Sequence, residues 1–352
     1  MTAATDFPAS KTAIPLSFGA MTVGGEGTMQ ARIHDLPTFQ SILDLLKEHG
    51  QEEIDTARVY GSMTSEEYVR DVGAERQGFK IATKCFPNSS FGAMPDITQY
   101  DHTPKMLRQS VDDSMKALST DKVDLFYLHA PDRKNPIGDA LRVVDEEYKK
   151  GRFDRFGISN YTVAEIEEIM RICEANGYVK PTVYQGLYNC LVRSAEPELV
   201  PCLRKYGISY YIYNPLGGGF LTGTYKPDKT DEEDNNAEKG KGSRFDKSSW
   251  QGQGYWKRYF HDAIFEAIEV IRPKAEAHQI PLAEVALRWC MHHSVLKRKY
   301  NDHVIFSASS IKHVQENLAA FEKGPLPDAL VKAIDEAWTV VDKSGQAPKY
   351  HF

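Results

Sequence analysis

Four polar residues in the first half of the chain have the types that proton transfer to a carbonyl oxygen needs. Asp55, Lys84 and His129 each follow a short apolar run, and Tyr60 comes five positions after Asp55. A phenol has a pKa of about 10 and gives up its proton poorly near neutral pH, but an adjacent ammonium lowers that pKa. Lys84 would supply this charge, Asp55 would keep Lys84 protonated, and His129 would donate a hydrogen bond to the carbonyl oxygen. The set suits reduction of a carbonyl by hydride, because the alkoxide that forms must be protonated.

Each of these residues also has a structural interpretation when it is taken alone. Asp55 would cap a helix, and Tyr60 would be a packed aromatic side chain. Lys84 would be a solvated strand end, and His129 a hydrogen-bonded core histidine. The chemical interpretation therefore depends on whether the fold brings the four side chains together.

The elements that would position them are short apolar runs that alternate with longer segments of helical spacing. The predicted strands are 14–21, 52–57, 79–84, 123–129, 155–160, 182–186, 208–215 and 303–309. Eight strands, each followed by helix, favour one closed (β/α)8 TIM barrel domain over 1–352, with an open doubly wound sheet as the alternative. In such barrels the active site forms at the C-terminal ends of the strands, which is where Asp55, Lys84 and His129 fall.

Start signals precede several of the predicted helices. A side-chain oxygen at such a position accepts hydrogen bonds from the free N–H groups of the first helical turn. The predicted caps are Thr64 with Glu67, Thr103 before Pro104, Asn135 before Pro136, and Thr162 with Glu165.

The strand and helix alternation is interrupted between the seventh and eighth strands by a long segment. It begins with a polar run, 227–243, which has too few apolar residues to pack and is predicted to be a mobile loop. Two helical segments follow, at 255–278 and 281–293, and an additional C-terminal helix is predicted around 326–342.

Composition and charge favour a small-molecule partner. The formal net charge is −6 with both signs interspersed, which leaves no basic stripe for nucleic acid and no polybasic membrane patch. The five cysteines are scattered without a C-x-x-C pair, so neither a disulfide framework nor a metal site is predicted. No leader sequence and no apolar stretch of about 18 residues is visible, so we expect a cytoplasmic protein.

Ordered motifs over most of the chain extend the four-residue pattern. They are "IDTARVYG" (54–61), "IATKCFP" (81–87), "VDLFYLHAPD" (123–132), "GISNY" (157–161), "PTVYQGLYN" (181–189), "YNPLGGGFLTGTYK" (213–226) and "SSIKHVQENLAA" (309–320). From about residue 14 to the C-terminus the chain resembles the aldo-keto reductases, and within them the aflatoxin-aldehyde reductase branch. The resemblance implies Tyr60 as general acid, Lys84 and Asp55 as its tuning pair, and His129 as the donor that orients the carbonyl.

The resemblance also implies a nicotinamide cofactor, for which NADPH is favoured over NADH. No Rossmann domain is predicted, because "GAMTVGGEG" after the first strand breaks the G-x-G-x-x-G spacing. Ser159, Asn160 and Gln185 would hold the carboxamide, and Tyr213 would stack on the nicotinamide ring. A glycine-rich turn would approach the pyrophosphate, and the helix opened by two serines would take a phosphate. The residues expected to bind the cofactor are Met21, Ser159, Asn160, Gln185, Tyr213, Asn214, Pro215, Leu216, Gly218, Gly219, Lys226, Ser309, Ser310, Lys312, His313 and Asn317.

The loop 242–260 is the expected substrate cover. In it Arg244 would select polar, dicarbonyl or carboxylated aldehydes, since a guanidinium binds a carboxylate through two hydrogen bonds, and Trp250 would line an apolar wall. The alternatives are a solvated loop charge for Arg244 and a packed side chain for Trp250. With Tyr60 and His129 these residues form the predicted substrate site for an aldehyde or ketone. A sensor or regulatory protein that binds NADPH with little turnover is the alternative function, and a barrel lyase or isomerase acting on a phosphorylated metabolite is a third. Members of the resembled branch often form homodimers, so we expect one here.

Overall fold

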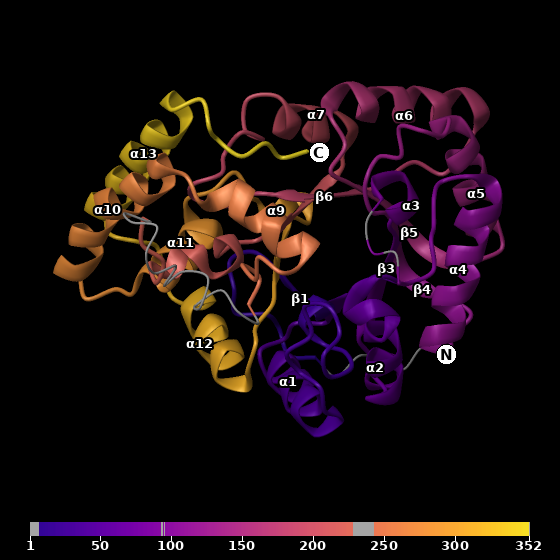
Figure 1. Ribbon diagram of the computed structural model, residues 1–352, viewed down its shortest axis with the longest axis horizontal. Helices are drawn as coiled ribbons and strands as arrows, with labels where there is room; N and C mark the ends of the chain where they lie inside the picture. Colours follow the sequence, from indigo (N-terminus) through magenta and orange to yellow (C-terminus); the bar gives the residue numbers. More distant parts are fainter. Residues whose placement is uncertain (1–6, 93, 95, 228–242, 352) are drawn as a thin grey trace.

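The computed structural model describes residues 7–92, 94, 96–227 and 243–351. Its centre is a closed barrel of eight parallel strands, joined in sequence order and closed by pairing of the first with the last (Figure 1). The strands are β1 (Leu16–Gly19), β2 (Glu53–Asp55), β3 (Lys80–Cys85), β4 (Val123–Leu128), β5 (Phe153–Ser159), β6 (Val183–Leu187), β7 (Ser209–Tyr213) and β8 (His303–Phe306). All eight predicted strands are confirmed, and the closed barrel excludes the open sheet.

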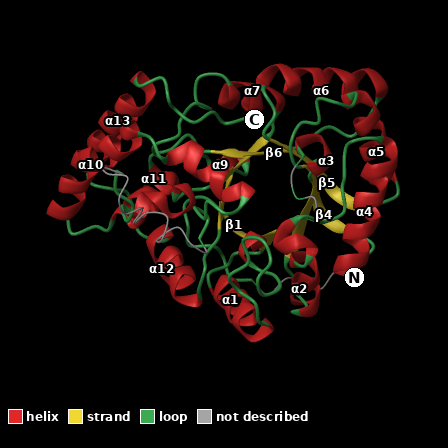
Figure 2. Cartoon of the chain, viewed as in Figure 1, coloured by secondary structure: helices red, strands yellow, loops and turns green. Residues whose placement is uncertain are grey.

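Helices surround the strands on the outside (Figure 2). The strands are buried by the helices outside and by side chains inside, which explains why apolar residues recur along the predicted runs. The helices are α1 (Leu36–Glu48), α2 (Ser65–Asp71), α3 (Asn88–Phe91), α4 (Pro104–Leu118), α5 (Ile137–Lys149), α6 (Val163–Asn176), α7 (Leu199–Tyr206), α9 (Trp250–Tyr259), α10 (Asp262–Ala277), α11 (Leu282–His292), α12 (Ile311–Phe321) and α13 (Asp328–Lys343). Short 3-10 turns are η1 (Ala20–Thr22), η2 (Tyr60–Met63), η3 (Glu75–Gln77), η4 (Gly217–Thr222) and η5 (Arg298–Tyr300). None of the described helices is both long enough and apolar enough to span a bilayer.

Two of the predicted helix caps are confirmed. The Thr103 hydroxyl accepts from the Met106 N–H at the start of α4, and Thr162 forms a reciprocal capping box with Glu165 at the start of α6. Their side chains therefore satisfy N–H groups that would otherwise lack partners.

The other two predicted caps are wrong. Thr64 precedes α2, but its hydroxyl donates to the Gly61 carbonyl and accepts from the Gly25 N–H instead. Asn135 donates to Asp132, and α5 begins one residue later than this cap requires. Thr64 is held by a contact with the loop after β1, and Asn135 by a residue three positions earlier, so neither side chain is left to cap its helix.

The long segment between β7 and β8 departs from the prediction in one respect. The predicted helix over 255–278 is two helices, α9 and α10, separated at Phe260 and His261, where Phe260 leaves the helical conformation with φ −82 and ψ 70. The predicted helix over 281–293 is α11, and the additional C-terminal helix is α13, which packs beside α10 outside the barrel (Figure 1). Most of the predicted mobile loop, 228–242, lies outside the described residues.

The barrel interior is packed with side chains from neighbouring strands. Tyr127 of β4 lies fully buried inside it, and a Cβ added at Gly157 of β5 would come 2.4 Å from the Tyr127 ring. Gly157 is therefore required because the aromatic ring occupies the space of its missing side chain.

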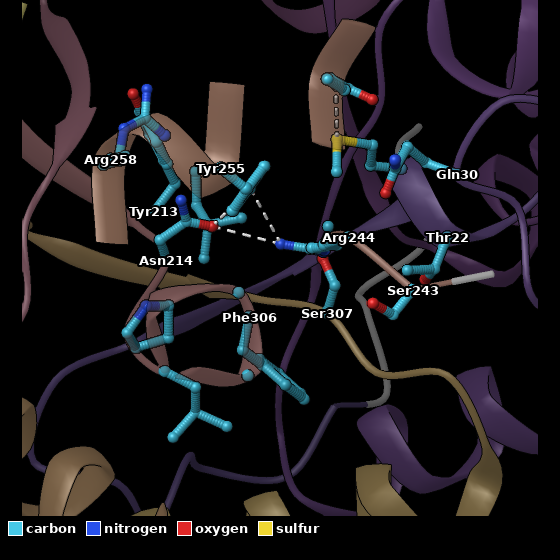
Figure 3. A pocket seen from close by; sticks show the side chains of 18 of the residues that line it. Thr22, Gln30, Tyr213, Asn214, Ser243, Arg244, Tyr255, Arg258, Phe306 and Ser307 are labelled. Atoms are coloured by element: carbon cyan, nitrogen blue, oxygen red, sulfur yellow. Dashed lines mark hydrogen bonds between the residues drawn. The ribbon is translucent and has the colours of Figure 1, made fainter. Parts of the chain in front are cut away.

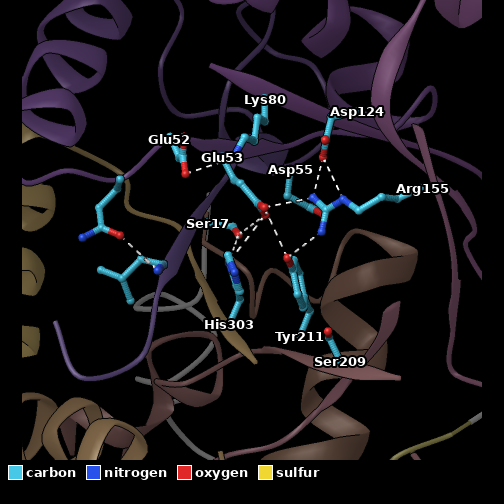
Figure 4. Close-up of polar contacts among 12 residues, drawn as sticks. Ser17, Glu52, Glu53, Asp55, Lys80, Asp124, Arg155, Ser209, Tyr211 and His303 are labelled. Atoms are coloured by element: carbon cyan, nitrogen blue, oxygen red, sulfur yellow. Dashed lines mark hydrogen bonds and ion pairs between the residues drawn. The ribbon is translucent and has the colours of Figure 1, made fainter. Parts of the chain in front are cut away.

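An ionic cluster fills the bottom of the barrel, at the N-terminal ends of the strands (Figure 4). Glu53 accepts hydrogen bonds from Arg155 at 2.9 Å, from Tyr211 at 3.2 Å and from Ser17 at 3.0 Å. Arg155 also pairs with Asp124, and the His303 ring stacks on Tyr211 with centroids 4.1 Å apart. We call Ser17, Glu53, Asp124, Arg155, Tyr211 and His303 the lower cluster.

Candidate active site

A cavity of about 1940 Å³ opens at the other end of the barrel, where the strands end. Asp55, Tyr60 and His129 line it, and Lys84 lies directly behind them with no exposed surface. The four residues come from the ends of β2, β3 and β4 and from the turn after β2, so neighbouring strands bring together what the sequence separates. The fold therefore brings the four side chains together, as the chemical interpretation of the sequence requires.

The distances among the four side chains define one connected group. Lys84 Nζ donates to Asp55 Oδ1 at 2.5 Å and to the Thr56 carbonyl at 2.7 Å. The Tyr60 hydroxyl lies 3.5 Å from Lys84 Nζ and 3.5 Å from His129 Nε2. The phenol thus stands between an ammonium and an imidazole at the edge of the cavity.

Burial sets the protonation of these groups. It raises the pKa of Tyr60 well above its usual value, an effect to which the Asp55 charge adds, and it lowers the pKa of His129 well below its usual value. The net pKa of Tyr60 is therefore raised, whereas the sequence led us to expect a lowered one, because desolvation is the largest influence on the phenol. Tyr60 is a protonated phenol and His129 a neutral imidazole, which are the forms that donate a proton and a hydrogen bond.

The Lys84–Asp55 pair is buried as well. Burial lowers the pKa of Lys84 and raises the pKa of Asp55, and the attraction between the two charges opposes both shifts. Gln185 Nε2 donates to Asp55 Oδ2 at 2.8 Å, so both carboxylate oxygens have a donor.

An unusual turn presents Tyr60. Gly61, Ser62 and Met63 all have positive φ, at 55°, 49° and 78°. The loop after β1 fastens this turn, since the Met29 N–H donates to the Ser62 hydroxyl at 3.2 Å and the Gly25 N–H donates to Thr64 at 2.9 Å. Non-glycine residues adopt this conformation at a cost, so tertiary contacts must maintain it.

A second polar group extends from His129 across the cavity. Asn160, at φ 66°, donates to the His129 carbonyl at 3.0 Å and to the Ser159 hydroxyl at 2.9 Å. The Tyr213 hydroxyl donates to Asn160 Oδ1 at 2.8 Å. Ser159, Asn160 and Tyr213 are therefore held in one arrangement at the ends of β5 and β7.

The glycine-rich turn after β7 forms another wall of the cavity (Figure 3). Arg244 donates to Asn214 Oδ1 at 3.2 Å and to the Tyr255 hydroxyl at 3.4 Å. A Cβ at Gly218 would come 2.5 Å from the Tyr255 ring, and Gly218 and Gly219 have φ of 71° and 103°. Only glycine permits this close approach together with this backbone conformation.

Most of the predicted cofactor and substrate residues line the cavity. They are Met21, Ser159, Asn160, Gln185, Tyr213, Asn214, Pro215, Leu216, Gly218, Gly219, Ser309, His313, Asn317, Arg244 and Trp250. The lining does not include Lys226, Ser310 or Lys312. Ser310 caps α12 by accepting from the His313 N–H, and the largely exposed Lys312 lies 3.8 Å from Glu316.

Several lining residues were not predicted. Arg258 of α9 lies beside Tyr255, with its guanidinium 5.6 Å from the ring centre, and Phe86 packs 5.3 Å from the His129 ring. Arg258 follows Tyr255 by three positions, a helical spacing that could have placed it on the same face. Gln30 also lines the cavity, but no spacing in the sequence indicates this, because its position depends on how an irregular loop folds.

Comparisons with known proteins agree with this geometry. The model of the Aldo/keto reductase family matches residues 15–339. A solved aldo-keto reductase from Bacillus halodurans in its holo form has a TM-score of 0.68 at 23% identity, covering 92% of this chain and 91% of its own. At that identity the likeness shows the fold alone.

Curated relatives are more similar in sequence. An aldo-keto reductase of Pseudocercospora fijiensis is 41% identical over 88% of this chain and all of its own length. The aldo-keto reductase pigE of Monascus ruber is 37% identical, covering 97% of this chain and 98% of its own, and human aflatoxin B1 aldehyde reductase member 2 is 38% identical, covering 92% and 88%. The chain therefore belongs to the aldo/keto reductase family, whose members are oxidoreductases that act on small carbonyl compounds with a nicotinamide cofactor.

Proposed function

We propose that the protein reduces aldehydes and ketones to alcohols with NADPH, and that Tyr60 donates the proton. The observation that carries the proposal is the position of the Tyr60 hydroxyl, 3.5 Å from both Lys84 Nζ and His129 Nε2 at the edge of the cavity. A carbonyl oxygen placed between the phenol and the imidazole would receive a hydrogen bond from each.

Each of the four central residues has a separate role in this reaction. A nicotinamide held in the cavity would supply hydride to the carbonyl carbon, which would leave negative charge on the oxygen. Tyr60 gives its proton to that oxygen, and the resulting phenolate is stabilised by the Lys84 ammonium, which Asp55 holds in place. Neutral His129 orients the oxygen by donating from Nε2 and needs no change of charge.

The cavity walls suit a nicotinamide nucleotide. Gln185 uses Nε2 on Asp55, which leaves its Oε1 to accept from a carboxamide, and Asn160 and Ser159 stand beside it. Asn214 Nδ2 is buried without a hydrogen-bond partner in the described chain, next to a glycine turn that lets a ligand approach the backbone. Such an unpaired donor fits a phosphate oxygen.

The preference for NADPH is proposed from the start of α12. His313 Nδ1 lies 3.0 Å from the Ser309 hydroxyl, and both residues line the cavity with Asn317. A 2′-phosphate there would meet these side chains and the positive end of the helix.

The substrate class is proposed to be polar or carboxylated aldehydes. Arg258 and Arg244 both line the cavity, and Arg258 has no hydrogen bond or ion pair with any described residue. Phe86 and the half-exposed Trp250, with ring centres 6.5 Å apart, offer an apolar surface beside His129. The carboxylate of a substrate would therefore bind beside the guanidinium groups, and its carbon skeleton would pack against Phe86 and Trp250.

The first test follows the loss of NADPH absorbance with 4-nitrobenzaldehyde and with succinic semialdehyde. We expect wild type to reduce both and Tyr60→Phe to lose about 10²- to 10⁴-fold in kcat while keeping NADPH affinity. Tyr148→Phe, at an exposed tyrosine, is the matched control and should not change the rate. A wild type that binds NADPH but reduces neither aldehyde would favour the sensor alternative.

The substrate class has its own test. Arg258→Gln and Arg244→Ala should each lower kcat/KM about tenfold for succinic semialdehyde, with little change for 4-nitrobenzaldehyde. Equal losses on the two aldehydes would rule out a carboxylate contact for that arginine.

A further inference from the structure

Three buried polar oxygens near the cavity have no hydrogen-bond partner among the residues that the structure describes. They are Thr22 Oγ1, Gln30 Oε1 and Gln251 Oε1, and each of these residues lines the cavity. Thr22 is 5% exposed and Gln30 is 7% exposed, and in Figure 3 both lie on the opposite side of Arg244 from Tyr213 and Asn214. No hydrogen-bonding group in the described part of the chain reaches these oxygens.

The loop after β1 holds two of them in place. It folds back so that the Arg32 and Ile33 N–H groups donate to the Thr22 carbonyl at 2.7 and 2.9 Å. Gln30 precedes this contact with φ 62°, a conformation that is costly for a residue with a side chain. The backbone, rather than a hydrogen bond of its own side chain, therefore sets where Gln30 lies.

Gln251 reaches the same place from α9. Its Nε2 lies 3.7 Å from the Met21 sulfur, which is a weak acceptor, and its Oε1 has no donor. The loop after β1 and the start of α9, distant in sequence, thus bring two carboxamides and one hydroxyl to the same wall of the cavity.

The chemistry of these groups limits what can satisfy them. A buried acceptor left without a donor costs free energy, so the natural complement is a group that donates. A phosphate or carboxylate offers only acceptors, whereas an alcohol donates to an amide oxygen and also accepts from an amide N–H or from Thr22.

We propose that Thr22, Gln30 and Gln251 form a hydroxyl-binding rim of the active site. The inference rests on the proposed function, because the ligand hydroxyl belongs either to a ribose of the cofactor or to a substrate alcohol near the carbonyl. A hydroxyl bound there would replace the missing hydrogen bonds and fix the ligand relative to Tyr60.

The test uses Gln30→Met and Thr22→Val, which keep side-chain size and remove the polar groups. Gln40→Met is the matched control, since Gln40 lies on α1 and its amide is bound to Asp44 and Gln77. For each protein we measure NADPH affinity by fluorescence without aldehyde, and kcat/KM for glyceraldehyde and for propanal, which lacks the hydroxyls. We expect a loss of about five- to tenfold in one of the two readouts in both rim variants.

The two sources of the hydroxyl give different results. Weaker NADPH binding with an unchanged preference for glyceraldehyde over propanal would assign the hydroxyl to the cofactor ribose. Unchanged NADPH binding with a reduced preference would assign it to the substrate. If both NADPH binding and the preference for glyceraldehyde stay as in wild type, in variants that fold as wild type, the proposed rim is overturned.

Two further measurements separate the possible failures. Gln30→Gly also removes the amide and suits the positive φ, so it tests the rim even if Gln30→Met folds poorly. Failure of the wild type itself to oxidise NADPH with any aldehyde would refute the proposed function, whereas an active wild type with unaffected variants refutes only the rim.

Discussion

The barrel holds two buried polar networks, and one strand contributes to both. Glu53 begins β2 and belongs to the lower cluster, whereas Asp55 ends β2 and belongs to the group around Tyr60. Both Glu53 oxygens accept hydrogen bonds within the lower cluster. Around the upper cavity, by contrast, buried atoms of His129, Asn214 and Gln30 have no partner among the described residues.

This difference separates a structural network from one that can receive a ligand. Charges in a low-dielectric interior stabilise a fold only if their hydrogen bonds are complete, and the lower cluster meets that condition. The upper network leaves hydrogen bonds unmade on the side of the cavity, so its incomplete pairing marks where a substrate and cofactor would bind.

The largest expected effect comes from breaking the upper network with Asp55→Asn. The change removes the anion that holds Lys84, so the ammonium beside Tyr60 loses its partner and the phenolate loses its stabilising charge. We expect kcat to fall about 10²-fold or more, measured by NADPH oxidation at saturating aldehyde.

Glu53→Gln is the matched change two residues earlier on the same strand. It alters the lower cluster, so kcat should stay within about twofold of wild type. A comparable rate loss in Glu53→Gln would show that the two networks are one functional unit.

The next effect is on stability and comes from the lower cluster. Arg155→Met leaves the buried Glu53 and the partly buried Asp124 without their cation. Removing one partner of a buried pair costs about 3–5 kcal/mol, and we expect about 3 because the guanidinium is 23% exposed. Urea unfolding measures the loss, and kcat per folded molecule should be unchanged. A variant that is as stable as wild type but has a reduced kcat would contradict the separation of a structural lower cluster from a catalytic group around Tyr60.

A third buried group makes stability depend on pH. His102 is 1% exposed, and neither ring nitrogen has a hydrogen bond in the described chain. Burial lowers its pKa to about 4, against about 6.5 in the unfolded chain. Between these values the unfolded chain binds a proton that the native state does not, so stability falls as pH falls.

The size of this effect follows from the two pKa values. The loss between pH 6.5 and 4 is about 3 kcal/mol, at about 1.4 kcal/mol for each pKa unit. His102→Leu should flatten the stability curve over this interval when urea unfolding is measured at several pH values. An unchanged slope would mean that His102 is not the group responsible.

The sequence predicted the barrel and the four central residues because both depend on local signals. Apolar runs with turns between them define strands, and the active site lies where parallel strands end. Asp55, Lys84 and His129 could therefore be placed before any distance was known. The predicted caps at Thr103 and Thr162 depend on equally local hydrogen bonds.

What the sequence could not provide depends on tertiary burial and on irregular loops. The pKa of Tyr60 is raised rather than lowered, because desolvation is a property of the packed site. The Thr64 hydroxyl accepts a hydrogen bond from the loop after β1 instead of capping α2, and Gln30 lies at the cavity because of a turn that has no sequence periodicity.

The smallest expected effect tests whether the two networks are connected. Tyr127 lies between them: Lys84 Nζ is 5.7 Å from its ring centre, and its pKa is raised by burial and by the charges of Asp55 above and Glu53 below. Its hydroxyl is buried without a hydrogen-bond partner in the described chain, so it relays nothing from one network to the other.

Tyr127→Phe removes this unpaired hydroxyl and keeps the ring that fills the space at Gly157. Because an unsatisfied buried polar group costs free energy, its removal should leave stability unchanged or raise it by up to about 1 kcal/mol, with kcat and its pH profile as in wild type. Urea unfolding and a pH series of NADPH oxidation provide the measurements. A shifted pH profile with intact stability would mean that the phenol does join the two networks, and the upper and lower groups would then have to be treated as one titrating system.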